Sequence, residues 1–381
     1  IEKEQYEQIL AKGSVQVQKM TIAQKQGAPL AVETAMMIFT PQFVELEKCE
    51  ASVGKNNIAL SGKLQNFIPY ILKDQTLKGS LRVSSDYICL NDFMTVQDSV
   101  AVPVQTEAAA DTVSPALLLI PRNLDFTATV DLKEVVLDHM ALSAITGDIR
   151  INKGMLTLNG LQLSAFGGKI IATGKYDTSD ATSPVLDMQL AVEDASFAKT
   201  FGSIESVRKM APVFENMTGR YSMNLDFETH LLPGMTPDLN SVNAKGALNS
   251  RDVKISGVAA LDKLAEVLKR DALKTITPKD LNLTFVVKQG RITIDPFQLK
   301  LGDTVLSLGG TTGLDQTIDY KGSVILPADG FKALGIHVKN LPFTITGTYK
   351  HPDVALDMKA LSSSASDAIG NLFKEIKKKV K

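Results

Sequence analysis

Apolar residues recur at every second position through much of this chain, and this period of two restricts its fold more than any other feature. The stretch IALSGKL places Ile58, Leu60 and Leu64 on one side and Ser61 and Lys63 on the other. A strand with one covered and one wetted face needs this alternation, because successive side chains point to opposite faces. The same pattern recurs at 77–83, 126–132, 170–176, 221–227, 297–301, 318–325 and 343–349.

Turn signals separate the alternating segments: Ser-Ser-Asp at 84–86, Asn-Lys-Gly at 152–154, Lys-Gln-Gly at 288–290 and Gly-Gly at 309–310. Many short strands joined by tight turns predict a mainly β protein. We expect an elongated, curved antiparallel sheet of the β-groove or half-barrel type, with a few amphipathic helices. Strands should hold roughly half of the residues, above the usual 20–25%.

Three segments have helical rather than strand periodicity. Residues 194–210 and 258–273 carry apolar side chains at a spacing of three and four. Residues 362–381 form a basic amphipathic segment that ends in IKKKVK. This last segment is either a surface-packed helix or a helix that contacts anionic lipid.

The chain is longer than one compact core usually supports, with 381 residues. Residues 97–116 lack sustained alternation and predict a linker or mobile loop. We therefore expect an N-terminal β segment at 1–96, a main β-repeat domain at 117–361 and the C-terminal helix at 362–381.

An internal repeat is the most specific feature of the sequence. Residues 154–174 read GMLTLNGLQLSAFGGKIIATG, and residues 290–310, at an offset of 136, read GRITIDPFQLKLGDTVLSLGG. Each copy predicts a strand, a bend, a second strand, a turn and a third strand. A weaker echo lies at 77–93. Such units cover their apolar faces by stacking side by side.

The repeat also predicts which side chains share a face, because it preserves both the period and the bend. In the first copy these are Leu156, Leu158, Leu161, Leu163 and Ile170, and in the second copy Ile292, Ile294, Phe297, Leu299 and Leu306. These residues either line an open trough that binds lipid or form a core under the helices. The alternation is the same in both cases.

Charge and motif content exclude several functions. The chain has 41 Lys and Arg against 42 Asp and Glu, whereas a nucleic-acid-binding surface normally leaves a basic excess. Four scattered histidines and two cysteines match no metal or nucleophile motif. We predict no catalytic residue, no metal site and no cofactor, and hence a protein that is not an enzyme. No apolar run is long enough for a transmembrane helix.

Residues 120–177, from IPRNLDFTATVDLKEV to AFGGKIIATGKYD, resemble the C-terminal region of AsmA-like proteins of Gram-negative bacteria, which are abundant in the Bacteroidetes. The resemblance extends through DPFQLKLGDTVLSLGGTTGLDQTIDYKGSVILP at 295–327 and LPFTITGTYKHPDVALD at 341–357, and upstream to 39–72. It covers most of the chain, and its motifs are strand-and-turn phrases without catalytic residues.

The resemblance implies a periplasmic cell-envelope protein, anchored in the inner membrane by a segment upstream of Ile1. AsmA-like proteins are similar in architecture to bridge-like lipid transfer proteins. The implied function is binding or conducting phospholipid, or another acyl-chain lipid, along an apolar β-groove in outer-membrane biogenesis. The alternative is a periplasmic scaffold that contacts envelope assembly proteins. Membrane contact is expected through the upstream anchor, and the C-terminal helix is a second candidate.

Overall fold

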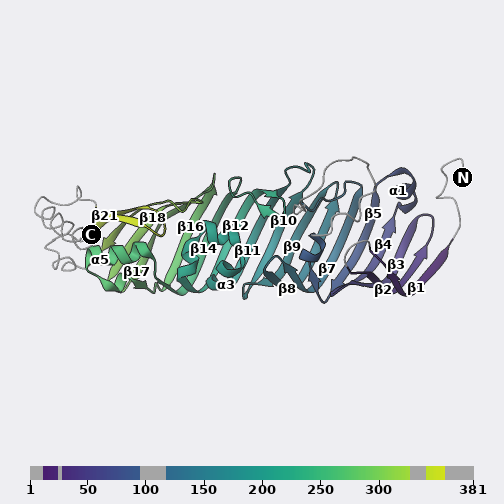
Figure 1. The fold of residues 1–381 in the computed structure, drawn as a ribbon, viewed down its shortest axis with the longest axis horizontal. Helices are drawn as coiled ribbons and strands as arrows, with labels where there is room; N and C mark the ends of the chain where they lie inside the picture. Colours follow the sequence, from purple (N-terminus) through teal and green to yellow (C-terminus); the bar gives the residue numbers. More distant parts are fainter. Residues whose placement is uncertain (1–11, 25–27, 95–116, 327–339, 357–381) are drawn as a thin grey trace, which may run out of the picture. The chain divides into compact units, whose positions relative to one another are not determined.

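The computed structural model describes residues 12–24, 28–94, 117–326 and 340–356 (Figure 1). Within these residues, 21 strands belong to one large, mostly antiparallel, open sheet, which a few short helices accompany. The predicted mainly β, antiparallel class with few helices is confirmed. The predicted linker at 97–116 and C-terminal helix at 362–381 lie outside the described residues.

The chain divides into two compact units. Unit 1 draws on residues 1–165, 169–190 and 227–238, and unit 2 on residues 166–168, 191–226 and 239–381. The elements of unit 1 are β1 (Gly13–Ile22), β2 (Leu30–Phe39), β3 (Phe43–Val53), β4 (Asn56–Gln65), α1 (Phe67–Lys73), β5 (Leu77–Ser85), β6 (Ile88–Cys89), α2 (Asn91–Met94), β7 (Leu124–Leu137), β8 (Met140–Asn152), β9 (Met155–Ala165) and β13 (Thr236–Pro237).

Three strands contribute residues to both units: β10 (Gly168–Asp177), β11 (Val185–Ser196) and β12 (Met217–Leu232). The elements of unit 2 are α3 (Phe197–Ser203), α4 (Glu205–Met210), η2 (Pro212–Asn216), β14 (Asn243–Ser256), α5 (Ala259–Leu268), η3 (Asp271–Leu273), β15 (Thr275–Ile276), β16 (Asp280–Lys288), β17 (Arg291–Leu301), β18 (Thr304–Gly313), β19 (Ile318–Ile325), β20 (Asn340–Gly347) and β21 (Pro352–Leu356).

The strand order of unit 1 departs from a meander at β7, beside which both β5 and β6 run parallel. β1 to β5 follow one another as antiparallel neighbours, as do β7 to β9. β5 and β7, however, run parallel, with Leu77 beside Leu124 and Ser85 beside Leu132. A parallel neighbour starts from the same end of the sheet, so the chain must cross over before it can pair. The predicted linker falls within this crossover connection.

Both copies of the repeat contain a β-bulge at the predicted bend. In β9 the register against β8 shifts between Asn159 and Gln162, and Gly160 there has a left-handed φ of 62°. In β17 the register against β18 shifts between Ile294 and Phe297. One extra residue on the bulged strand reverses the alternation. Apolar residues on both sides of the bend therefore share a face.

The helix predicted at 194–210 is corrected by the structure. β11 continues to Ser196, whose side chain accepts a hydrogen bond from the Lys199 amide at 3.4 Å and caps α3. Ile204 is extended and separates α3 from α4. The second predicted helix, 258–273, begins one residue later, at Ala259, and its α-helical part ends at Leu268, because Lys269 takes the left-handed conformation that closes it.

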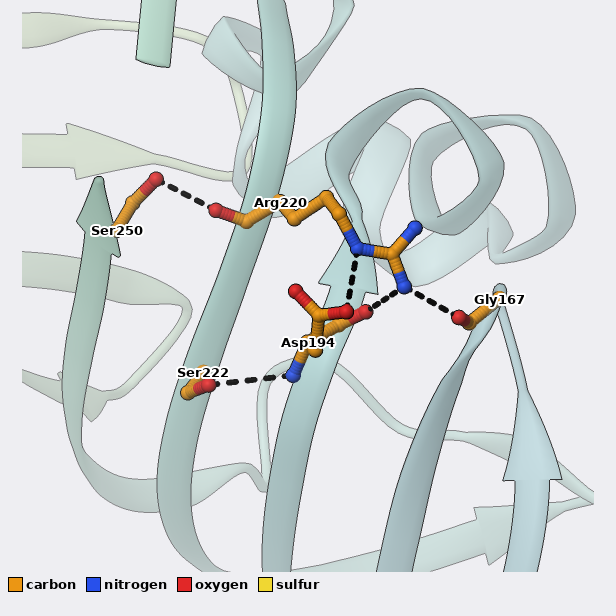
Figure 2. Close-up of polar contacts among 5 residues, drawn as sticks. All are labelled: Gly167, Asp194, Arg220, Ser222 and Ser250. Carbon is orange, nitrogen blue, oxygen red and sulfur yellow. Dashed lines mark hydrogen bonds and ion pairs between the residues drawn. The ribbon is translucent and has the colours of Figure 1, made fainter. Parts of the chain in front are cut away.

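Arg220 explains why residue 194 cannot begin a helix. Its Nε lies 2.7 Å from a carboxylate oxygen of Asp194, and its guanidinium also donates to the carbonyls of Gly167 and Asp194 (Figure 2). Asp194 itself has a φ of 55°, and its amide donates to the Ser222 hydroxyl at 3.1 Å. These contacts hold the end of β11 in a left-handed turn.

The core of unit 2 lies between the sheet and short helices. Phe197 of α3 packs against Tyr221 of β12 and Phe214 of η2, with ring centroids 4.7 and 4.9 Å away. Six of the ten residues of α5 are buried, Leu264 completely. The helix packs on β21, where Lys263 Nζ donates to the Pro352 carbonyl at 2.5 Å.

Candidate functional site

One face of unit 1 is apolar from β1 to β9, and we call it the unit-1 face. Residues paired directly across neighbouring strands share a face of the sheet, so the register defines rows of side chains. The central row contains no polar side chain: Val15, Met37, Leu46, Gly62, Leu81, Ala128, Ile149 and Leu158.

Two further rows flank the central one. The first consists of Gly13, Phe39, Val44, Leu64, Gly79, Phe126, Ile151 and Leu156. The second consists of Val17, Ala35, Cys49, Leu60, Val83, Val130 and Gly147. The thiol of Cys49 is the only side-chain group in the three rows that has a polar hydrogen. Burial, and then the Glu50 carboxylate, raise the pKa of its thiol, which favours the neutral form.

The unit-1 face is only partly covered. Leu46, Leu81 and Leu158 are each half-buried, and Val15 on β1 is 45% exposed. A small cluster is better packed: Leu161 and other partly buried side chains surround the following buried residues, Val130, Val135 and Ile145. Most of the face is thus intermediate between a core and a solvated surface.

The opposite face of the same strands is hydrophilic. One of its rows runs through Glu45, Lys63, Ser80, Thr127, Arg150 and Thr157. Arg150 forms an ion pair with Asp125 at 3.3 Å, and Thr129 donates to Asp148 at 2.7 Å. Unit 1 therefore presents one polar and one apolar side of a single sheet.

The structure places the ten sequence-predicted residues in different surroundings. In the first copy, Leu156, Leu158, Leu161 and Leu163 lie on the unit-1 face and are half-buried, whereas Ile170 of β10 is buried. In the second copy, Leu299 is 3% and Leu306 1% exposed. The remaining three, Ile292, Ile294 and Phe297, are half-buried.

The two copies differ in burial at one of the five equivalent positions: Leu299 is buried, whereas Leu163 is half-buried. In unit 2, α5 supplies a buried apolar side that packs against β21, and Val324 of β19 and Leu341 of β20 are fully buried. In unit 1, α1 has no buried residue. Leu299 therefore belongs to a buried core in unit 2, whereas Leu163 lies half-buried on the unit-1 face.

Sequence reasoning missed most of the unit-1 face. Alternation predicts strands in the segments that form β4, β5 and β7. On the unit-1 face, however, it assigns only the repeat residues of β9 to the lipid-binding site. The alternation GSVQVQ in β1 carries the same signal, with Val15 and Val17 on the apolar side. Assigning all of these segments to one face requires the register, which no local pattern contains.

Polar chemistry is sparse in the part of the chain that the structure describes. No group of three or more His, Cys, Asp or Glu side chains there could hold a metal ion. The nearest approach to a nucleophile–base pair is Ser183, whose Oγ lies 2.8 Å from His230 Nδ1 at an exposed position. Asp180 beside them accepts hydrogen bonds from Thr182, and these lower its pKa.

None of the described helices has the length and apolar character needed to cross a bilayer. No family model matches this chain, and no curated protein matches it. Among solved structures, three mutants of Rh. blastica porin align with 7–8% identity over 91% of this chain and 88% of the porin, each at a TM-score of 0.16. These values carry no argument about function. The resemblance to AsmA-like proteins remains a prediction.

Proposed function

We propose that this protein binds the acyl chains of phospholipid, or of another lipid, against the unit-1 face, and that it acts without catalysis. The observation that supports the proposal is the continuous row from Val15 to Leu158, which crosses eight strands without a polar side chain and stays partly exposed. Monomeric soluble proteins rarely expose contiguous apolar areas of more than a few hundred Å² unless they bind something there.

The dimensions suit a hydrocarbon chain. Seven steps between neighbouring strands, at about 4.8 Å each, give a row of roughly 34 Å. One leaflet of a bilayer contributes about half of a hydrocarbon core of about 30 Å, so the row exceeds the length of one extended acyl chain. Each buried CH₂ group contributes about 0.8 kcal/mol to binding.

The three rows hold no polar side chain apart from the Cys49 thiol, and this also restricts the ligand. A headgroup or sugar placed over these rows would lose hydrogen bonds to water without gaining new ones. Only the hydrocarbon part of a lipid therefore fits the centre of the face. With the AsmA-like resemblance, the proposal extends to a periplasmic protein of outer-membrane biogenesis that holds or conducts phospholipid.

A scaffold for envelope assembly proteins is the second candidate, and β1 favours it. Nine of its ten residues are exposed, and it pairs with β2 on one side. A strand at the edge of a sheet can accept a further strand from a partner. The scaffold function predicts a bound protein rather than a bound lipid.

Organic extraction and mass spectrometry of the purified protein test the first proposal. Phospholipid should co-purify with the native chain, and Leu158→Glu should remove it, because a carboxylate on the central row must remain hydrated. Thr157→Glu is the matched control, since Thr157 lies next in sequence but on the polar face, opposite Arg150. A folded native protein that carries no lipid would refute the proposal, and so would equal loss in both variants.

A further inference from the structure

The helix α1 is unusual because it is apolar and has no buried residue. Its sequence is FIPYILK, and it joins β4 to β5. Ile71 is 72% and Leu72 62% exposed, higher values than for any other large hydrophobic side chain that the structure describes. Leaving two adjacent aliphatic side chains in water is unfavourable, because each would gain about 1.5–3 kcal/mol from burial.

The helix is held in a defined position by its two ends. Asn66 and Asp74 flank it in left-handed conformations, and the Asp74 amide donates to the Pro69 carbonyl. The Asn66 side chain donates to the Thr76 carbonyl at 2.7 Å, and Asn123 donates to the Asp74 carboxylate at 2.8 Å. The exposed side chains are therefore presented by anchored backbone.

The unit-1 face continues to the base of this helix. Leu64 of β4 belongs to the first flanking row and is three residues before Phe67, and its cross-strand neighbour Gly79 lies just after the start of β5. A second apolar segment precedes β7, which begins at the same end of the sheet as β5: Leu118 is 55% and Leu119 43% exposed.

We propose that α1 inserts Ile71 and Leu72 into the surface of a phospholipid bilayer, so that lipid passes between the bilayer and the unit-1 face; this inference rests on the proposed function. The charge of the helix suits phosphate headgroups, because it contains no acidic residue and has Lys73 in its last turn. The Asp74 carboxylate, which follows the helix at its C-cap, accepts a hydrogen bond from the Asn123 amide.

Tryptophan fluorescence can test this directly, because the natural chain has no tryptophan. In Leu72→Trp, mixed phosphatidylcholine–phosphatidylglycerol vesicles should shift the emission to the blue, and brominated phosphatidylcholine should quench it. Leu232→Trp is the matched control, since Leu232 is 47% exposed at the end of β12. Equal response of both proteins, or no response of Leu72→Trp, overturns the proposal.

Vesicle flotation of the double variant Ile71→Ser with Leu72→Ser gives the second measurement. We expect at least about a tenfold loss of vesicle binding, with Leu232→Ser unchanged. Extraction of the same samples separates the two proposals. If the double variant retains lipid but no longer binds vesicles, both proposals are supported. If brominated lipid quenches Leu72→Trp but no lipid co-purifies with the protein, α1 insertion is supported and the lipid-binding function is refuted. A double variant that converts a dimer to a monomer in light scattering would show that a second copy covers α1, and would overturn the bilayer proposal.

Discussion

Leu163 and Leu299 occupy the same position in the two copies of the repeat, 136 residues apart, and they differ in burial. Leu299 is 3% exposed in unit 2, whereas Leu163 is half-buried beside the small cluster on the unit-1 face. Replacing each by Glu introduces the same charge at equivalent points of the same strand pattern. The two variants therefore compare a covered apolar face with an open one.

The expected magnitudes differ severalfold. Leu299→Glu loses about 1.5–3 kcal/mol of apolar burial. It adds several kcal/mol for an unpaired buried charge. The sum approaches the whole stability of a typical domain, about 5–15 kcal/mol. Leu163→Glu keeps its carboxylate in contact with water and loses only part of the packing, about 1–2 kcal/mol.

Urea unfolding followed by circular dichroism, with lipid extraction of the same preparations, measures both effects. Leu299→Glu should unfold unit 2 or shift its transition strongly. The destabilisation by Leu299→Glu should be smaller in acid, where the introduced carboxyl group is neutral. Leu163→Glu should fold with a small shift in midpoint and lose its lipid. Equal destabilisation by the two substitutions would show that the unit-1 face is also a closed core, and would refute the distinction between the copies.

Three further predictions concern the fold. In a urea titration, Gly310→Ala should lower the free energy of unfolding by at least about 2 kcal/mol, because Gly310 has a φ of 158° and a Cβ would lie 2.3 Å from the Asp319 carbonyl oxygen. The control Gly202→Ala should change the free energy of unfolding by less than about 1 kcal/mol, because nothing lies within 4 Å of a Cβ at that position. In a thermal melt, Arg220→Ala should lower the free energy of unfolding by about 1 kcal/mol, because it removes the contacts with Asp194 and Gly167. The control Lys209→Ala removes an exposed helical ion pair with Glu205 and should lower the free energy of unfolding by less than about 0.5 kcal/mol. Burial raises the pKa of Tyr221, so the unfolded state should lose this proton first, and stability should fall as pH rises past the ordinary tyrosine value of about 10. In alkaline urea titrations Tyr221→Phe should flatten this fall of stability with pH, and an unchanged slope would contradict the raised pKa of Tyr221.

Features that depend on short spacing were readable from the sequence. The period of two predicted strands and their apolar sides, and Asn159-Gly160 marked the bend that the bulge in β9 occupies. The register agrees with the predicted common face of Leu158 and Leu161, because the bulge preserves it across the bend. The prediction that these residues bind lipid stays a prediction.

Features that depend on distant contacts were not readable. The apolar spacing of three and four residues favoured a single helix over 194–210. Arg220, 26 residues further on, instead binds the Asp194 carbonyl and carboxylate at the end of a strand. The parallel pairing of β5 with β7 is likewise absent from any local pattern, since an alternating strand pairs equally well in either direction.

Alternation acts within a few residues, so the order of the amino acids is enough to predict strands with one apolar face each. It did not determine what meets that face, since water, a helix or a lipid chain all leave the same alternation. The tertiary fold distinguishes the two copies at one equivalent pair. Leu299 is 3% exposed in unit 2, while Leu163 lies half-buried on the unit-1 face. That difference comes from packing between segments far apart in the chain.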